Sequence, residues 1–254
     1  MVDLIALVVP AGLDPWVAIA LVAVSFAASM LTAALGIGGG LLMLAVMAGA
    51  VPPLVLIPVH GVVQLGSNLG RAALFHRHVR RAILGWFALG AVVGVTVGAS
   101  VAINLPRPVL LGLIGVFILV STWAPKLGSR PVPVRGFTLV GAATAFITMF
   151  VGATGPFLAP FLSAERLGDR QATIGTFAAC MSLKHALKVT AFTVAGFAFG
   201  PWLPLIAAMI ASGFAGTVAG KAIVVRLPER LFRIGFRVIL TALALRILWQ
   251  AATV

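Results

Sequence analysis

A run of glycines interrupts the first long apolar stretch of the chain. The stretch extends from Trp16 to Val51, and the sequence Gly36-Ile37-Gly38-Gly39-Gly40 lies within it. In lipid, an opened backbone is tolerated only where protein buries it or where it lines a wet cavity. The run therefore predicts a helix that ends inside the membrane, with the free N–H groups of the next short helix, Leu41 to Ala50, directed at a polar or anionic group. The alternative is that the glycines only allow two helices to pack closely.

The composition is that of a polytopic membrane protein. Of the 254 residues, 61% are hydrophobic and 9% are charged. Because no long polar linker is present, we expect a single transmembrane domain over residues 1–254. The formal net charge of +13 is scattered between apolar segments, which excludes the basic face of a nucleic-acid-binding protein. We expect membrane lipid as the surroundings of the chain and no nucleic-acid partner.

Eight segments are long and apolar enough for us to expect transmembrane helices. They are Trp16 to Leu35, Pro53 to Phe75, Ile83 to Ile103, Pro108 to Trp123, Gly136 to Phe150, Ala172 to Phe197, Trp202 to Val225 and Leu231 to Trp249. Two further apolar segments, Leu41 to Ala50 and Phe157 to Ala164, are too short to cross a bilayer as straight helices. The predicted fold is thus an all-α polytopic membrane protein with eight long helices and two short broken or re-entrant ones.

The links between these segments predict the orientation. The links at 76–81, 126–135, 165–170 and 226–233 are basic, whereas those at 50–52, 104–108 and 198–201 contain only Arg107. Basic links stay in the cytoplasm, which places both chain ends outside. Met1 to Pro10 contains Asp3 and no basic residue, unlike a cleaved signal peptide, so we expect the first span to be retained.

The two halves of the chain repeat each other. The sequence Gly152-Ala153-Thr154-Gly155-Pro156-Phe157-Leu158 matches the first glycine run and its following residues, and Leu105-Pro106 matches Leu227-Pro228. These matches occur in the same order and define a first repeat at 14–124 and a second at 135–250. The link after Phe75 is basic, but the matching link after Phe197 is neutral. We therefore predict inverted-topology repeats, an architecture of secondary transporters in which the substrate site lies where two broken segments meet.

With these two glycine motifs and the twofold layout, the chain resembles the sulfite exporter TauE/SafE family of permeases over nearly its whole length. The resemblance implies a bacterial inner-membrane transporter of small sulfur-containing anions, such as sulfite or organosulfonates. In an inner membrane, the orientation predicted from the links puts both chain ends in the periplasm. The second motif has Thr154 and Pro156 where the first has Gly38 and Gly40. We therefore do not expect the two loops to contribute identically.

Positively charged side chains lie deep in one predicted span. Lys184, His185 and Lys188 are near the middle of the segment Ala172 to Phe197, and no long span contains an acidic residue. A lysine at the centre of a bilayer costs about 2.5 to 3.5 kcal/mol on insertion scales. An anionic ligand or a wet cavity would compensate this cost. The alternative is that the lysines extend to the interface or donate hydrogen bonds to carbonyls of the broken helices.

A polar stripe lies at the matching place of the first half. This stripe lies on one face of a helix and consists of Gln64, Ser67, Asn68 and Arg71. We predict that it forms a second wall of the site. The alternative is that these side chains make hydrogen bonds between helices without contacting a ligand. With residues of both glycine loops, the predicted substrate-binding set is Gly38, Gly39, Gly40, Gln64, Ser67, Asn68, Arg71, Thr154, Gly155, Lys184, His185 and Lys188.

Other polar residues receive structural interpretations. We expect His60 to be packed and hydrogen-bonded in the interior. We expect Cys180 to fill a small apolar space. His76-Arg77-His78 lacks a carboxylate or cysteine partner, so we expect no metal site and no cofactor. The coupling ion, H⁺ or Na⁺, is left open because no carboxylate lies at mid-depth.

The function predicted from these features is a secondary transporter that carries a small anion by alternating access. A passive anion channel would use the same residues and is the first alternative. An intramembrane enzyme is the second, but the sequence contains no H-E-x-x-H motif, and Ser67 with His185 is the best nucleophile and base pair available. We therefore expect no enzyme. The sequence leaves the direction of transport and a homo-oligomer open.

Overall fold

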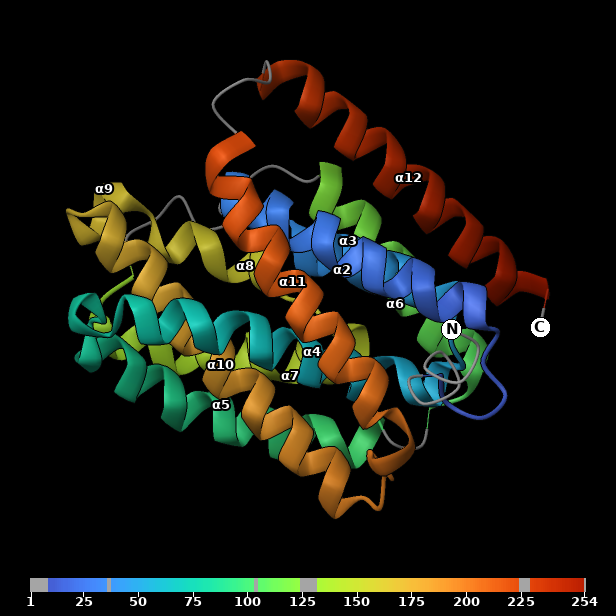
Figure 1. The fold of residues 1–254 in the computed structure, drawn as a ribbon. Helices are drawn as coiled ribbons and strands as arrows, with labels where there is room; N and C mark the ends of the chain where they lie inside the picture. The colour runs from blue at the N-terminus through green and yellow to red at the C-terminus, as the bar shows by residue number, and fades with distance from the viewer. Residues whose placement is uncertain (1–8, 36–37, 103–104, 124–131, 224–228, 254) are drawn as a thin grey trace.

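The computed structural model describes residues 9–35, 38–102, 105–123, 132–223 and 229–253, and its regular elements are all helices (Figure 1). Each of the expected long segments contains a long helix within its described residues. The long helices are α2 (Pro15–Leu35), α4 (Pro53–Leu74), α5 (Arg81–Ala102), α6 (Arg107–Trp123), α7 (Phe137–Val151), α10 (Arg170–Val194), α11 (Leu203–Ile223) and α12 (Glu229–Thr253). The shorter elements are α3 (Gly39–Ala48), η1 (His76–His78), η2 (Val134–Gly136), α8 (Gly155–Leu158), η3 (Ala159–Leu162), α9 (Ala164–Leu167) and η4 (Gly200–Trp202). The all-α prediction is confirmed.

Among the described residues, five helical stretches are long and apolar enough to cross a membrane. They are Pro15–Ala33, Arg81–Ala102, Val134–Val151, Gly200–Gly220 and Ile234–Thr253. Helix α6 is apolar but has only 17 residues. Helices α4 and α10 have 22 and 25 residues, but polar side chains lower their mean hydropathy. These two helices contain most of the predicted substrate-binding side chains.

The main helix contacts join the two halves of the chain. Helix α2 packs against α11, α5 against α7, α4 against α10, and α6 against α12. Each of these pairs contains one helix from residues 14–124 and one from residues 135–250. The halves therefore interlock, and the polar pair of α4 and α10 is placed next to both glycine motifs.

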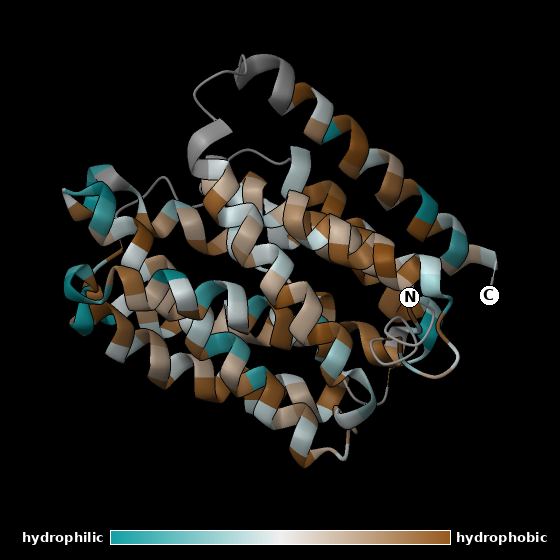
Figure 2. Cartoon of the chain, viewed as in Figure 1, coloured by the Kyte–Doolittle hydropathy of each residue, from teal (hydrophilic) through white to brown (hydrophobic). Residues whose placement is uncertain are grey.

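Hydrophilic residues gather at one end of the molecule. Figure 2 shows them around η1 and α9, whereas the start of α2 and the end of α12 lie at the opposite end (Figures 1 and 2). The backbone N–H of Arg80 donates to Thr176 Oγ1 at 3.0 Å, and its guanidinium donates to the Leu167 carbonyl at 3.0 Å. Asp169 caps α10 by accepting the backbone N–H groups of Gln171 and Ala172, and these bonds lower the pKa of its carboxyl. The link expected at 165–170 thus contains most of α9 and the residue that caps α10.

The first glycine break lies between α2 and α3, which are in contact. Gly38 has a φ of 110°, and α3 begins at the next residue. A Cβ atom on Gly39 would lie 1.8 Å from the Ala28 carbonyl oxygen of α2, so the two backbones are in direct contact. At Gly39, the glycine therefore serves to let two helices pack closely, which was the alternative interpretation of the run. Gly36 lies outside the described residues.

The second break differs from the expected single short helix at Phe157 to Ala164. Helix α7 ends at Val151, Gly152 follows with a φ of 77°, and the next residues form α8, the 3₁₀ helix η3 and α9 in turn. The physical reason is proline: Pro156 is the second residue of α8, and Pro160 lies at the start of η3, where it lacks an N–H donor. The second break is thus a chain of short turns rather than one half-helix.

Candidate functional site

A small cavity lies where the two glycine breaks meet. Its walls come from α2, α3, α4, α10 and the turn after α7. It is lined by Thr32, Gly38, Gly40, Leu41, Gln64, Asn68, Arg71, Ala153, Gly155, Pro156, Phe177, Met181 and His185. About 30 Å³ is open to the centres of water molecules, enough for a few waters. The cavity contains seven of the predicted substrate-binding residues, namely Gly38, Gly40, Gln64, Asn68, Arg71, Gly155 and His185.

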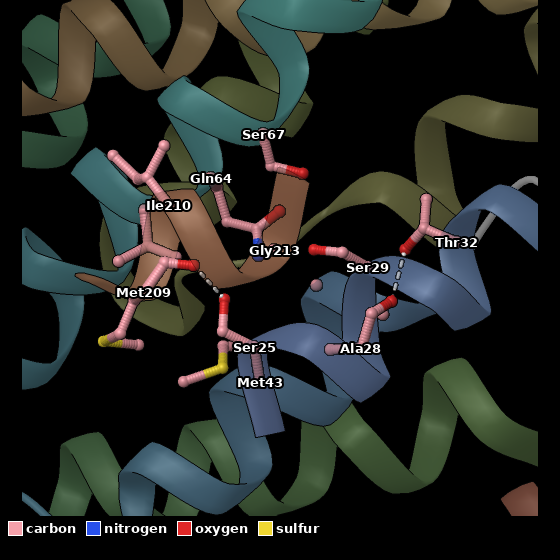
Figure 3. Close-up of a pocket in the computed structure, with 13 residues that line it drawn as sticks. Ser25, Ala28, Ser29, Thr32, Met43, Gln64, Ser67, Met209, Ile210 and Gly213 are labelled. Atoms are coloured by element: carbon pink, nitrogen blue, oxygen red, sulfur yellow. Dashed lines mark hydrogen bonds between the residues drawn. The ribbon is translucent and has the colours of Figure 1, made fainter. Parts of the chain in front are cut away.

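A second cavity adjoins the first and is lined by hydroxyl and apolar groups without charge (Figure 3). Its lining residues are Ser25, Ala28, Ser29, Thr32, Gly39, Gly40, Met43, Val63, Gln64, Ser67, Met209, Ile210 and Gly213. The two cavities share Thr32, Gly40 and Gln64. Predicted residues Gly39 and Ser67 belong to this second, uncharged cavity.

Sequence reasoning missed the hydroxyl groups of α2. Ser25 donates to the Met209 carbonyl at 2.6 Å, and Thr32 donates to the Ala28 carbonyl at 2.9 Å (Figure 3). Ser25, Ser29 and Thr32 are spaced as i, i+4 and i+7, which puts them on one face of a helix. This spacing was the signal that could have identified them.

The guanidinium of Arg71 lines the first cavity without a negatively charged partner among its hydrogen bonds. Its Nε donates to the Ser67 carbonyl at 3.2 Å, and its Nη2 donates to Ser67 Oγ at 3.4 Å and to Asn68 Oδ1 at 3.1 Å. Asn68 in turn donates to the Gln64 carbonyl at 2.7 Å. The hydrogen bonds of this stripe stay within α4, so they hold Arg71 in place and leave its charge uncompensated. Such a group suits an oxyanion, which accepts charge-assisted hydrogen bonds.

The imidazole of His185 faces the same cavity and has no hydrogen-bond partner. The side chain is fully buried, and neither Nδ1 nor Nε2 has a partner among the described residues. Its ring packs edge-on against His60 with 6.2 Å between the ring centroids. Burying a polar group without a hydrogen bond is costly, so this ring is suited to a polar ligand.

The N-terminus of α3 contributes backbone N–H groups. Gly38 precedes the helix, no side chain caps it, and Gly40 lines both cavities. His60 Nε2 lies 3.0 Å from the Gly40 carbonyl oxygen and joins this break to α4. His60 is fully buried, as expected of a packed, hydrogen-bonded histidine. The first-turn N–H groups and the helix dipole favour negative charge at this end of α3.

The two lysines are buried behind the second break and line neither cavity. Lys184 and Lys188 have no exposed surface. Lys184 Nζ donates to Thr154 Oγ1 at 2.5 Å, and Lys188 Nζ donates to the Gly152 carbonyl at 3.2 Å. Ala153 and Gly155 line the first cavity, so the backbone of this turn separates the lysines from it. From the sequence, hydrogen bonds to carbonyls of the broken helices were the alternative to an anionic ligand, and Lys188 makes such a bond.

Thr154 connects the lysine helix to α7. Its Oγ1 lies 2.5 Å from Thr148 Oγ1 and donates to the Thr144 carbonyl at 3.1 Å. Thr148 also donates to the Thr144 carbonyl at 2.7 Å. Thr144 and Thr148 were missed because each appears as one polar residue in an apolar span. Their i, i+4 spacing shows that they share a face.

Replacing Thr154 with Val is expected to destabilise the protein. The change leaves the buried Lys184 amine without its acceptor, which costs about 1 to 3 kcal/mol. Thermal unfolding in detergent would measure this loss as a lower Tm. The matched control is Thr138→Val on α7, because the Thr138 hydroxyl is buried without a partner. Equal Tm values for the two variants would contradict the role given to Thr154.

Comparison with known proteins identifies the family. No curated protein and no solved structure matches the chain. The model of one family, described as "Sulfite exporter TauE/SafE", matches residues 21–247. The match includes both glycine breaks, both polar helices and every residue that lines the two cavities. The chain therefore belongs to the sulfite exporter TauE/SafE family.

Proposed function

We propose that this membrane protein is a secondary transporter that moves a small sulfur-containing anion, sulfite or an organosulfonate, across the inner membrane by alternating access. Its family supports transport as the function. The observation that carries the choice of an anion is the first cavity, where the Arg71 guanidinium, the unpartnered His185 ring and the N-terminus of α3 converge. All three can donate hydrogen bonds to the oxygens of an acid group.

The proposed binding mode assigns different roles to the predicted residues. Arg71 contacts the acid group directly, and Gln64 and Asn68 add amide groups from the same helix face. Gly155 and Gly40 let the two breaks approach the anion with their backbones. Lys184 and Lys188 contribute positive charge from behind the second break.

The pattern of helix contacts supports the proposed inverted repeats. If the repeats are superposed, α2 corresponds to α7, α5 to α11, α4 to α10 and α6 to α12. Exchanging the halves converts the α2 and α11 contact into the α7 and α5 contact, and it leaves the other two main contacts unchanged. A twofold arrangement of this kind suits alternating access, because rocking of the halves would open the cavity to either side.

The distribution of charge supports a periplasmic location for both termini. The basic residues of η1 and the residues of α9 lie at the end of the molecule opposite to the start of α2 and the end of α12 (Figure 2). Under the positive-inside rule, the basic end is cytoplasmic.

Neither alternative function is favoured by the geometry. A passive channel requires a continuous wet path, whereas the first cavity is only large enough for a few waters. An enzyme based on Ser67 and His185 requires a hydrogen bond between them, and both His185 ring nitrogens lack one in the part of the chain that the structure describes.

Ligand-dependent stability tests the proposal. We expect sulfite, thiosulfate, sulfoacetate or taurine to raise the Tm of the purified protein more than acetate does, because a ligand that binds only the folded state stabilises it by about 2.7 kcal/mol at 100 times its Kd. In proteoliposomes, uptake of the stabilising anion should saturate and should accelerate when the same anion is loaded inside. Absence of both effects for every sulfur anion would overturn the proposal, and uptake without acceleration would favour the channel.

A further inference from the structure

Among the described residues, the groups around Lys188 are positive or neutral, and none is a carboxylate. All acidic residues of the chain lie outside the long spans, and they are Asp3, Asp14, Glu165, Asp169 and Glu229. The titratable groups that interact electrostatically with Lys188 are His60 from α4, and Lys184 and His185 from α10 itself. On the side of α7, Lys188 meets the Gly152 carbonyl, which is uncharged. Among the residues that the structure describes, a charged Lys188 therefore has no counter-ion.

Its hydrogen bonding is equally sparse. An ammonium group has three donors, but Lys188 Nζ has the Gly152 carbonyl as its one hydrogen-bond acceptor among the described residues. An unpaired ammonium in a low-dielectric interior carries a large desolvation cost. An anion in the adjoining cavity lowers this cost, and a charged Lys188 in turn strengthens the binding of that anion. The proton and the anion thus favour each other, as linkage requires.

Lys188 is connected directly to the second glycine break and indirectly, through His60, to the first. It is bound to the C-cap residue of α7 at the second break, and it interacts with His60, which holds Gly40 at the first break. Gly61 of α4 makes room for it, since a Cβ atom there would lie 2.6 Å from Lys188 Cε. A charge on Lys188 therefore acts on groups that are bonded to both breaks.

The repeat alignment puts Arg71 and Lys188 at matching positions of the two halves. Arginine keeps its proton in proteins, whereas a buried lysine can exchange one. The first half thus has a fixed charge that lines the cavity, and the second half has an exchangeable charge one layer behind it.

We propose that Lys188 takes up a proton when the anion binds and releases it with the anion on the other side, so that the protein is an anion–proton symporter. The amine lone pair accepts one H⁺ from water on the side of uptake, and the ammonium returns it to water on the side of release. This inference rests on the proposed transport function and names its coupling ion.

Methanesulfonate is the probe that tests the inference, because it stays ionised near neutral pH and brings no proton of its own. The full chain is reconstituted in proteoliposomes that contain a pH-sensitive dye. Exchange of labelled for unlabelled methanesulfonate at equal pH on both sides tests transport alone. Net uptake, with the anion and the internal pH recorded together, then gives the ratio of protons to anions.

For the unaltered protein we expect one proton per anion, and accumulation of the anion inside to at most ten times its outside concentration when the outside is one pH unit more acidic. Lys188→Arg fixes the charge, so its ratio should fall close to zero even where uptake is slow. Arg77→Lys keeps a positive charge at an exposed position of η1, outside the site, and its ratio should stay at one.

The outcomes separate the two proposals. Exchange by the unaltered protein without proton movement would overturn the symport inference and leave the transport function intact. A proton ratio of one in Lys188→Arg would remove Lys188 as the carrier. Absence of exchange would count against the transport of sulfonates. If Lys188→Arg fails to fold, the ratio of the unaltered protein still decides whether H⁺ is the coupling ion.

Discussion

Replacing Arg71 with Gln is expected to reduce anion affinity and transport by about 10- to 100-fold. The change removes the positive charge that lines the first cavity, and a hydrogen bond to a charged group contributes about 1.5 to 3 kcal/mol. The Arg71 guanidinium makes its present hydrogen bonds within α4, so its loss should affect ligand binding more than folding. The measurements are the ligand-induced shift in Tm and the rate of exchange in proteoliposomes.

Two further variants make this test specific. Arg77→Gln has the same change in charge, but Arg77 is exposed in η1, and its exchange should equal that of the unaltered protein. Arg71→Lys keeps the charge and loses the planar fork, so its affinity should fall between the two. Unchanged affinity in Arg71→Gln would remove Arg71 from the binding site.

Replacing Gly39 with Ala is expected to abolish the folded protein. The added Cβ would lie 1.8 Å from the Ala28 carbonyl oxygen and 2.2 Å from Thr32 Oγ1, so α3 can no longer pack on α2. The contact is with backbone, which cannot rotate away as a side chain can. We expect a loss of monodisperse protein in size-exclusion chromatography, or a large decrease in Tm for any protein that remains.

Neighbouring glycines provide matched controls for this change. Gly70→Ala on α4 has open space around the added methyl group and should leave the Tm unchanged or slightly higher. In Gly40→Ala, the Cβ would lie 3.0 Å from Gln64 Oε1, a flexible side chain, so this variant should fold with a narrowed cavity. A folded Gly39→Ala protein with a normal Tm would show that the first break does not need the close contact.

The long helices other than α4 and α10 were predictable because each is a nearly continuous apolar run with a polar or proline-containing end. The family was predictable because the two glycine motifs recur in the same order, and the match over residues 21–247 confirms it. The second break was not predictable in detail. Its apolar composition predicts a half-helix, but Pro160 removes a backbone donor and divides the segment into short turns.

The candidate site was predictable to the extent that helical spacing determines it. Gln64, Asn68 and Arg71 lie on one face of α4 and line the same cavity, as the i, i+4 and i+7 spacing indicates. The surroundings of Lys184 and Lys188 were not predictable, because they depend on how α10 packs against α7 and on where the chain turns at Gly152. The roles of Thr144 and Thr148 depend on that same tertiary contact.

The uncharged cavity beside Arg71 has a consequence for the size of the transported molecule. An inorganic oxyanion bound to the guanidinium would not reach the hydroxyl groups of α2, and water would remain bound to them. A molecule with a short polar tail would instead extend past Gln64, which lines both cavities. The tail would displace that water and contact Ser29 and Ser67 itself. Shortening the tail by single carbon atoms should then weaken binding in steps, while the acid end keeps its place.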